Sequence, residues 1–182
     1  MIDRSEASEA LADIDDMVRR VRQSRIYDLA SQLMVMWGVL VFAGYLVTYL
    51  LPQYAVIGWI AVYTIGIGGW GAFSAINQPK SGVRTFDLKF LYALAMIVIF
   101  GVFLCIFARF GPRQLSTFWP IYFMLFYSIA GLWFGYAFIV IGFAVSALTV
   151  VGNFYAGSAF DLWMAFVNGG GLILGGLWMR RS

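Results

Sequence analysis

Long apolar stretches alternate with short polar breaks along this chain. A helix needs about 20 apolar residues to cross the hydrocarbon core of a bilayer, and windows of that length predict six spans. The six spans cover residues 28–51, 54–77, 88–109, 115–133, 135–154 and 159–179. In lipid, backbone polar groups must be paired within the chain, and these stretches are too long for barrel strands. The pattern therefore predicts an all-α, polytopic membrane bundle over residues 28–182.

The fourth and fifth spans are almost continuous. Together they run from Leu115 to Phe154, which is about twice the length of one span. Two glycines flank Leu-Trp-Phe near the middle of this stretch, and we expect a turn between Gly131 and Tyr136. If the stretch were one long tilted helix instead, the C-terminus would lie on the other side of the membrane.

Three segments of the chain resemble one another. Residues 64–70, 127–133 and 172–178 each contain glycine, end in tryptophan and close an even-numbered span. Each odd-numbered span carries a glycine near its middle, and 32, 32 and 36 residues separate Gly38, Gly101 and Gly142 from the tryptophan that follows. We interpret the bundle as three related helical hairpins, because small residues let helices approach closely in lipid. Chance recurrence of two common residues is the alternative.

Residues 1–27 are polar and predict an amphipathic helix in the cytoplasm. Asp3 and Glu6 suit a helix start, and acids precede arginines, which complements the helix dipole. An apolar stripe recurs at helical spacing and consists of Leu11, Ile14, Val18 and Val21. Three interpretations stay open: a helix on the membrane surface, a short coiled coil with itself or with a partner, and disorder. On the membrane surface, anionic headgroups would be contacted by Arg19, Arg20, Arg22 and Arg25.

Basic residues predict the orientation of the spans. With six spans, ten of the 12 Lys and Arg residues fall on one side, and only Arg109 and Arg113 fall on the other. This asymmetry predicts a multi-pass protein of a bacterial-type inner membrane with both termini in the cytoplasm. The first 25 residues are polar and of mixed charge, so we do not expect a signal peptide.

Composition supports a membrane environment and limits the chemistry. The chain is 62% hydrophobic, whereas soluble domains are about 45–50% apolar. It contains no histidine and only one cysteine, Cys105, so a Ser/His/Asp set and an intrachain disulfide are impossible. We expect no cofactor, metal or catalytic residue. The expected partners are the lipid bilayer and a second copy or another membrane protein, with no nucleic acid.

Polar residues inside the spans are the remaining candidates for function. Asp161 opens the sixth span, and Asn168 follows seven residues later on the same helical face. A matching polar stripe on the fifth span contains Ser146, Thr149 and Asn153. We predict that these five residues line a small polar groove or permeation path between spans five and six. The alternative is a helix interface joined by hydrogen bonds.

The predicted hairpins resemble those of HdeD-like acid-resistance proteins, a family of small six-helix membrane proteins. The resemblance rests on the mid-helix glycines, on a proline in the outer turn (Pro52 and Pro112) and on a glycine-rich second helix. It covers residues 28–179, although the third hairpin lacks the outer-turn proline. It implies a bundle without a catalytic signature and assigns no functional residue.

Three functions stay open. The sequence favours a non-enzymatic membrane protein that acts through binding or assembly, as a partner subunit, a sensor or a stress-response component. The alternative is a small transporter or channel with a polar path between spans five and six. The third is a lipid-acting enzyme that uses Asp161 or Asp28. A single carboxylate without a partner base or metal argues against this third function.

Overall fold

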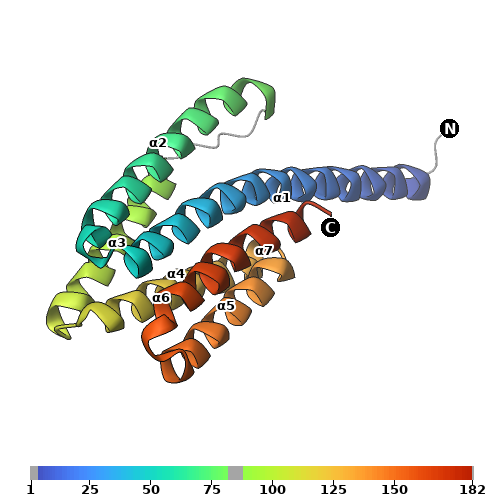
Figure 1. Ribbon diagram of the computed structural model, residues 1–182. Coiled ribbons are helices and arrows are strands. Elements are labelled where there is room, and N and C mark those ends of the chain that lie inside the picture. The colour runs from blue at the N-terminus through green and yellow to red at the C-terminus, as the bar shows by residue number, and fades with distance from the viewer. Residues whose placement is uncertain (1–3, 82–87, 182) are drawn as a thin grey trace.

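The structure is a computed structural model that describes residues 4–81 and 88–181, and these residues form a helical bundle without strands (Figure 1). The side chains that lie outside the described part belong to residues 4–10, 15, 19, 20, 22, 23, 25, 26, 73–81 and 88–91. The four arginines expected at the membrane surface, Arg19, Arg20, Arg22 and Arg25, are therefore described only by their backbone.

Successive crossings of the bundle run in opposite directions (Figure 1). The first five are α1 (Arg4–Leu50), α2 (Ala55–Ser81), α3 (Leu88–Phe107), α4 (Pro112–Phe134) and α5 (Tyr136–Tyr155). A short 3₁₀ turn, η1 (Pro52–Tyr54), joins α1 to α2. The last crossing is composite and consists of η2 (Gly157–Ala159), α6 (Phe160–Met164), the π-helix η3 (Ala165–Gly170) and α7 (Gly171–Met179).

Among the described residues, five helical segments are long and apolar enough to cross a membrane. They are Tyr27–Leu50, Pro52–Ala72, Pro112–Phe134, Tyr136–Tyr155 and Gly157–Met179. These segments agree with five of the six expected spans. α3 lies at the position of the remaining span, but its described apolar part, Tyr92–Phe107, is shorter than the other five. The structure thus has the long apolar helices of a polytopic membrane protein, and a total of six spans depends on α3.

Gly135 alone separates α4 from α5, so the expected turn is present and the two stretches are not one tilted helix. Its φ of 132° and ψ of 157° lie in a region that is accessible essentially to glycine alone. A β-carbon at this position would collide with the hydroxyl of Tyr27, which lies over the turn. Beyond the turn the two helices pack closely, and a β-carbon at Gly142 would lie 2.8 Å from the carbonyl oxygen of Met124.

α1 is the central helix and contacts α2, α6, η3 and α7. Its backbone meets that of the π-helix at two glycines. A β-carbon at Gly38 would lie 2.8 Å from the carbonyl oxygen of Gly169, and one at Gly169 would lie 2.6 Å from the Cα atom of Phe42. Helix association in lipid depends on close packing of this kind rather than on apolar burial. The position of α1 is therefore tied to that of η3.

The mid-helix glycines of the expected repeat meet different neighbours. Gly38 faces η3 and α7, whereas Gly101 faces two aromatic rings of α4 and Gly142 faces the α4 backbone. α4 and α5 belong to different expected hairpins, yet they form an extensive helix pair, while the described part of α3 touches α4 at few points. The three hairpins do not pack alike, so the repeat stays a prediction from the sequence.

α1 is continuous across the domain boundary expected between residues 27 and 28. Its N-terminal part extends beyond the other helices (Figure 1). We call residues 4–26 the N-terminal arm. Where the arm meets the bundle, the end of the last crossing lies beside the start of the first, because Arg180 Nε is 4.0 Å from Asp28 Oδ1.

Candidate functional site

Four polar residues come together within the bundle, near the end opposite the arm. We call Tyr45, Ser116, Asp161 and Asn168 the polar cluster. Tyr45 lies near the end of α1, Ser116 in the first turns of α4, Asp161 at the start of α6 and Asn168 in η3. The start of α4 is fixed locally, since Pro112 occupies its first turn and the backbone N–H of Gly111 donates to the Gln114 side chain at 2.7 Å.

Tyr45 connects α1 to α4. Its side chain is 2% exposed, and its hydroxyl donates to the backbone carbonyl of Ser116 at 3.0 Å. Its ring meets Trp59 of α2 edge to face, with 5.0 Å between the ring centroids. Trp59 is itself held by α1, because its indole N–H donates to the hydroxyl of Thr48 at 3.1 Å. The orientation of Tyr45 is thus fixed by both neighbouring helices.

Asn168 lies in the π-helical turn η3, the irregular part of the last crossing. Single π turns inside α-helices are found frequently at functional sites. The side chain is 7% exposed and lies near the Tyr45 hydroxyl. Its Oδ1 atom, however, is buried and has no hydrogen-bond partner among the described residues. The amide oxygen is therefore a buried acceptor without a described donor.

Asp161 presents a second buried acceptor without a partner. Its Oδ1 atom is buried and accepts no hydrogen bond from the described residues, although the Ser116 side chain lies close enough to interact with the carboxyl group. Leaving such a group unpaired costs about 1–3 kcal/mol, and more for a charged group. The polar cluster therefore holds two oxygen acceptors, from Asp161 and Asn168, for which no described protein group supplies a donor.

Arg113 lies beside the polar cluster and ties three elements together. Its Nη1 donates to the carbonyl of Gly157 at 2.6 Å, and its Nη2 to the carbonyl of Asn153 at 3.2 Å. Its guanidinium carbon sits 3.9 Å above the centre of the Phe160 ring, a favourable cation–π geometry. Arg113 thereby joins the start of α4 to the end of α5 and to η2. Arg113 also interacts electrostatically with Asp161, but its hydrogen bonds go to Gly157 and Asn153.

The five residues of the expected groove fall into three environments. Asp161 and Asn168 belong to the polar cluster. Asn153 lies in the Arg113 network, where its Oδ1 also accepts from the Thr117 hydroxyl at 3.1 Å. Thr149 is fully buried and donates to the carbonyl of Val145 within its own helix at 2.7 Å, and Ser146 is half-buried on the same helix. The structure thus connects Asp161 and Asn168 through α1 and α4 more than through α5.

Three residues of this site were not singled out by the sequence as site residues. Tyr45 was one of ten tyrosines in an aromatic-rich chain. Arg113 counted only as a loop charge, and Ser116 lay at the edge of an uncharged span. One signal for Arg113 was available, namely its position directly after Pro112, because proline favours the first turn of a helix and so placed the arginine there as well.

The fold and this site define the class of the molecule as a helical membrane protein with a buried polar cluster. Among the described residues, no group of three or more His, Cys, Asp or Glu side chains is arranged to hold a metal ion. No protein-family model, curated protein or solved structure matches the chain. The resemblance to HdeD-like proteins therefore stays a prediction.

Proposed function

We propose that this chain is a non-enzymatic protein of a bacterial-type inner membrane that binds a partner helix through its N-terminal arm. The exposed apolar stripe of the arm carries the proposal. Its members are between 54% and 65% exposed, and they are Leu11, Ile14, Val18 and Val21. Apolar residues at this spacing are typical of a helix that buries one face against another helix.

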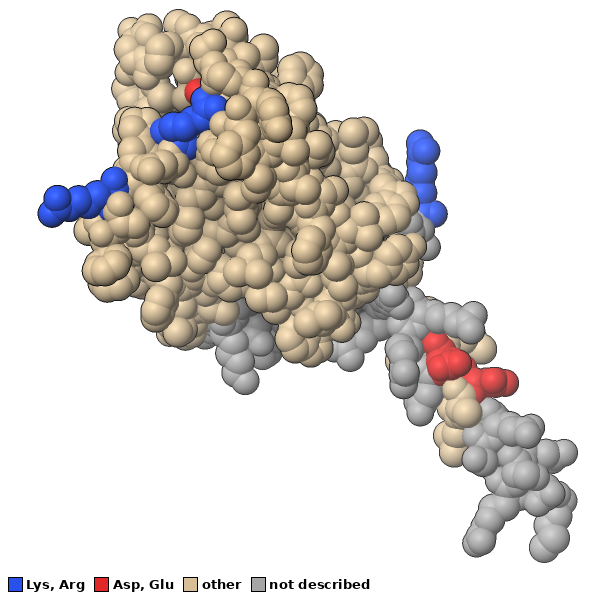
Figure 2. Space-filling model, turned by 90° about the horizontal axis from the view of Figure 1, so that it is seen from below, with Lys and Arg blue, Asp and Glu red and all other residues tan. Residues whose placement is uncertain are grey.

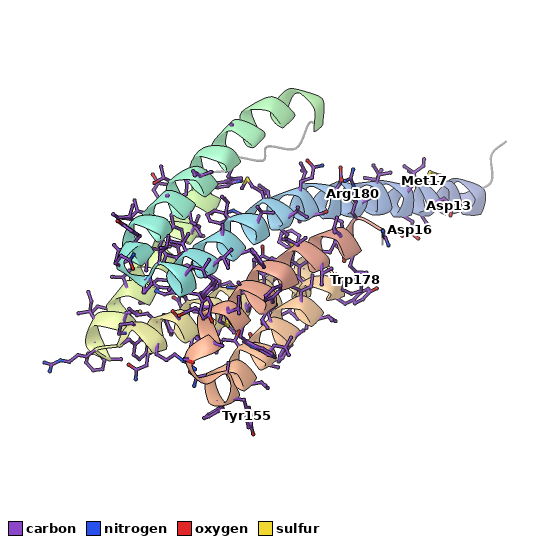
Figure 3. The ribbon with its side chains drawn as sticks, in the orientation of Figure 1. Asp13, Asp16, Met17, Tyr155, Trp178 and Arg180 are labelled. Carbon is purple, nitrogen blue, oxygen red and sulfur yellow. The ribbon has the colours of Figure 1, made fainter. Side chains whose placement is uncertain are left out.

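The direction of α1 favours a protein partner over the membrane surface. The arm continues α1 without a break, and at 1.5 Å per residue it reaches about 34 Å beyond the start of the first span. Asp13, Asp16 and Met17 project from this part of α1, where no other helix of the described chain lies beside it (Figure 3). A helix that leaves the bilayer along its own axis holds its stripe away from the lipid, where a second helix can cover it.

We also propose six spans with both termini in the cytoplasm. The contact between Arg180 and Asp28 supports an even number of crossings, because it joins the two ends of the spanning region. Figure 2 supports a membrane setting for the surface between the two ends of the bundle. Charged side chains appear at these ends, and the described residues in the middle of the face are uncharged. The ten-to-two distribution of basic residues supports the cytoplasmic assignment.

Co-purification with stripe variants tests the proposed arm function. The protein is extracted in mild detergent, and its mass is measured by light scattering after size exclusion. We expect a stoichiometric partner or a second copy that is lost in the Ile14→Asp/Val18→Asp variant. It is retained in Asp16→Asn, the matched control on the opposite face of the arm. A wild-type protein that elutes as a clean monomer, or a partner that persists in Ile14→Asp/Val18→Asp, contradicts the proposal.

A second candidate function is transport of a small solute, and the two unpaired oxygens of the polar cluster favour it. Buried polar groups inside membrane spans commonly mark substrate or ion pathways. Flux into proteoliposomes is the test, with Asp161→Asn as the variant that removes the carboxylate. Flux that is unchanged in Asp161→Asn, or absent for every solute offered, rules this candidate out.

A further inference from the structure

The hydrogen bonds of the polar cluster leave two of its acceptor oxygens without a partner. Tyr45 has one hydroxyl proton, and it is used on the carbonyl of Ser116. Arg113 directs its N–H groups to Asn153 and Gly157. The Ser116 hydroxyl and the Asn168 amide N–H groups are also donors, yet the Oδ1 atoms of Asp161 and Asn168 are buried and unpaired among the described residues. A ligand that completes this cluster must supply positive charge or a donor, and an anion does not fit.

The surroundings of the polar cluster limit the ligand to a small one. Asn168 is 7% exposed and Tyr45 2%. Gly169, the next residue of the π turn, brings the α1 backbone so close that a β-carbon there would lie 2.6 Å from the Phe42 Cα atom. The Trp59 ring covers Tyr45 from the side of α2. Burial of this degree at Asn168 and Tyr45 suits an ion better than an organic molecule.

We infer that the polar cluster binds a monovalent alkali cation of the size of Na⁺. The available ligands are oxygens from a carboxylate, an amide and hydroxyl groups, which are the hard ligands that such ions prefer. Asp161 supplies one formal negative charge, and Arg113 nearby repels any cation but repels a divalent ion twice as strongly as a monovalent one. An irregular turn within a spanning helix is also the setting in which transporters coordinate Na⁺. This inference is independent of the proposed function of the arm.

Trp59 provides a natural reporter for the inferred site. Its ring packs on Tyr45 and its N–H bonds to Thr48, so an ion that draws on the Tyr45 oxygen changes the environment of the indole. Tryptophan fluorescence and Tm of the full-length protein in detergent are measured during titration with NaCl, with choline chloride at equal ionic strength as the reference. We expect a saturable fluorescence change and a rise in Tm with Na⁺ alone.

Variants link these responses to the polar cluster. Asp161→Asn and Asn168→Ala each remove one of the unpaired oxygens or its charge, and we expect both to raise the Na⁺ midpoint at least tenfold or to abolish the response. Trp59→Phe removes the fluorescence change but leaves the Na⁺-dependent rise in Tm. Thr149→Ser is the matched control, because this buried hydroxyl bonds only within α5, and its response equals that of the wild type.

Asn168→Asp keeps the test decisive if the loss variants do not fold. The substitution adds a second carboxylate at the inferred site, so we expect a lower Na⁺ midpoint than in the wild type. Equal responses to NaCl and choline chloride overturn the inference, and the two oxygens then hold a buried water molecule. A Na⁺ response that survives in folded Asp161→Asn, or that K⁺ reproduces at the same midpoint, overturns it as well.

Discussion

Substitution of Gly135 by alanine offers the sharpest test of the packing at the α4–α5 turn. Its φ of 132° is strained for any residue with a β-carbon, which costs about 1–3 kcal/mol. The added methyl group also overlaps the Tyr27 hydroxyl, and forced overlap of this kind costs a further 1–3 kcal/mol or so. We therefore expect Gly135→Ala to lower the free energy of unfolding by about 2–6 kcal/mol.

Two further variants separate the strain from the overlap. Gly157 has a φ of 51° and no atom within 4 Å of an added β-carbon, so Gly157→Ala reports backbone strain alone, at about 1–2 kcal/mol. Tyr27→Phe removes a hydroxyl that has no partner among the described residues. By itself it is expected to be nearly neutral, and in the Gly135→Ala background it should restore about 1 kcal/mol as a coupling term.

The assay is unfolding in mixed micelles with increasing SDS, followed by tryptophan fluorescence. Each variant is compared with the wild type at the same lipid-to-detergent ratio, and the double-mutant cycle uses all four combinations of Gly135→Ala and Tyr27→Phe. A Gly135→Ala variant that is no less stable than Gly157→Ala contradicts the predicted overlap with Tyr27. An equal effect of Tyr27→Phe on the stability of both backgrounds contradicts it as well.

Three further predictions concern the packing and topology of the bundle. Arg113→Lys keeps the charge but loses the paired bonds to Gly157 and Asn153, so we expect a loss of about 1.5–3 kcal/mol in the same assay; wild-type stability contradicts this. Gly169→Ala should cost about 1–3 kcal/mol through its overlap with the α1 backbone, whereas Gly170→Ala, with nothing within 4 Å, should change little; equal effects refute the close approach. With Cys105→Ala as background, single cysteines near either terminus should react with an impermeant maleimide only after the cells are opened, and labelling of intact cells at one terminus contradicts six spans.

The positions of the long apolar helices could be predicted because one physical constraint fixes them. A spanning segment must match the thickness of the hydrocarbon and contain few charges. The expected spans at 28–51, 115–133 and 135–154 accordingly lie within a few residues of the helices in the structure. Gly135 marked the turn between the last two for a local reason, since its conformation excludes other residues. Signals of this kind lie within a few consecutive residues and need no knowledge of neighbouring helices.

The pairing of helices could not be predicted in the same way. Lipid is as apolar as the side chains, so an apolar face does not reveal whether it meets lipid or protein. Gly38, Gly101 and Gly142 have equivalent places in the sequence, yet they face η3, α4 and α4 respectively. What distinguishes them is the shape of the opposing helix. The backbone that opposes Gly38 belongs to Gly169, which lies 131 positions away in the sequence.

The sequence pointed to Asp161 and Asn168 but not to their partners in the polar cluster, because of a local irregularity and a distant contact. Regular α-helical spacing directs Asp161 and Asn168 toward one neighbour, and the fifth span offered polar residues at matching intervals. The π turn η3 breaks that spacing at residues 165–170, and Asn168 meets Tyr45 of α1 instead. Because glycines at 38 and 169 bring α1 against this turn, the same long helix carries the exposed arm at one end and Tyr45 near the other.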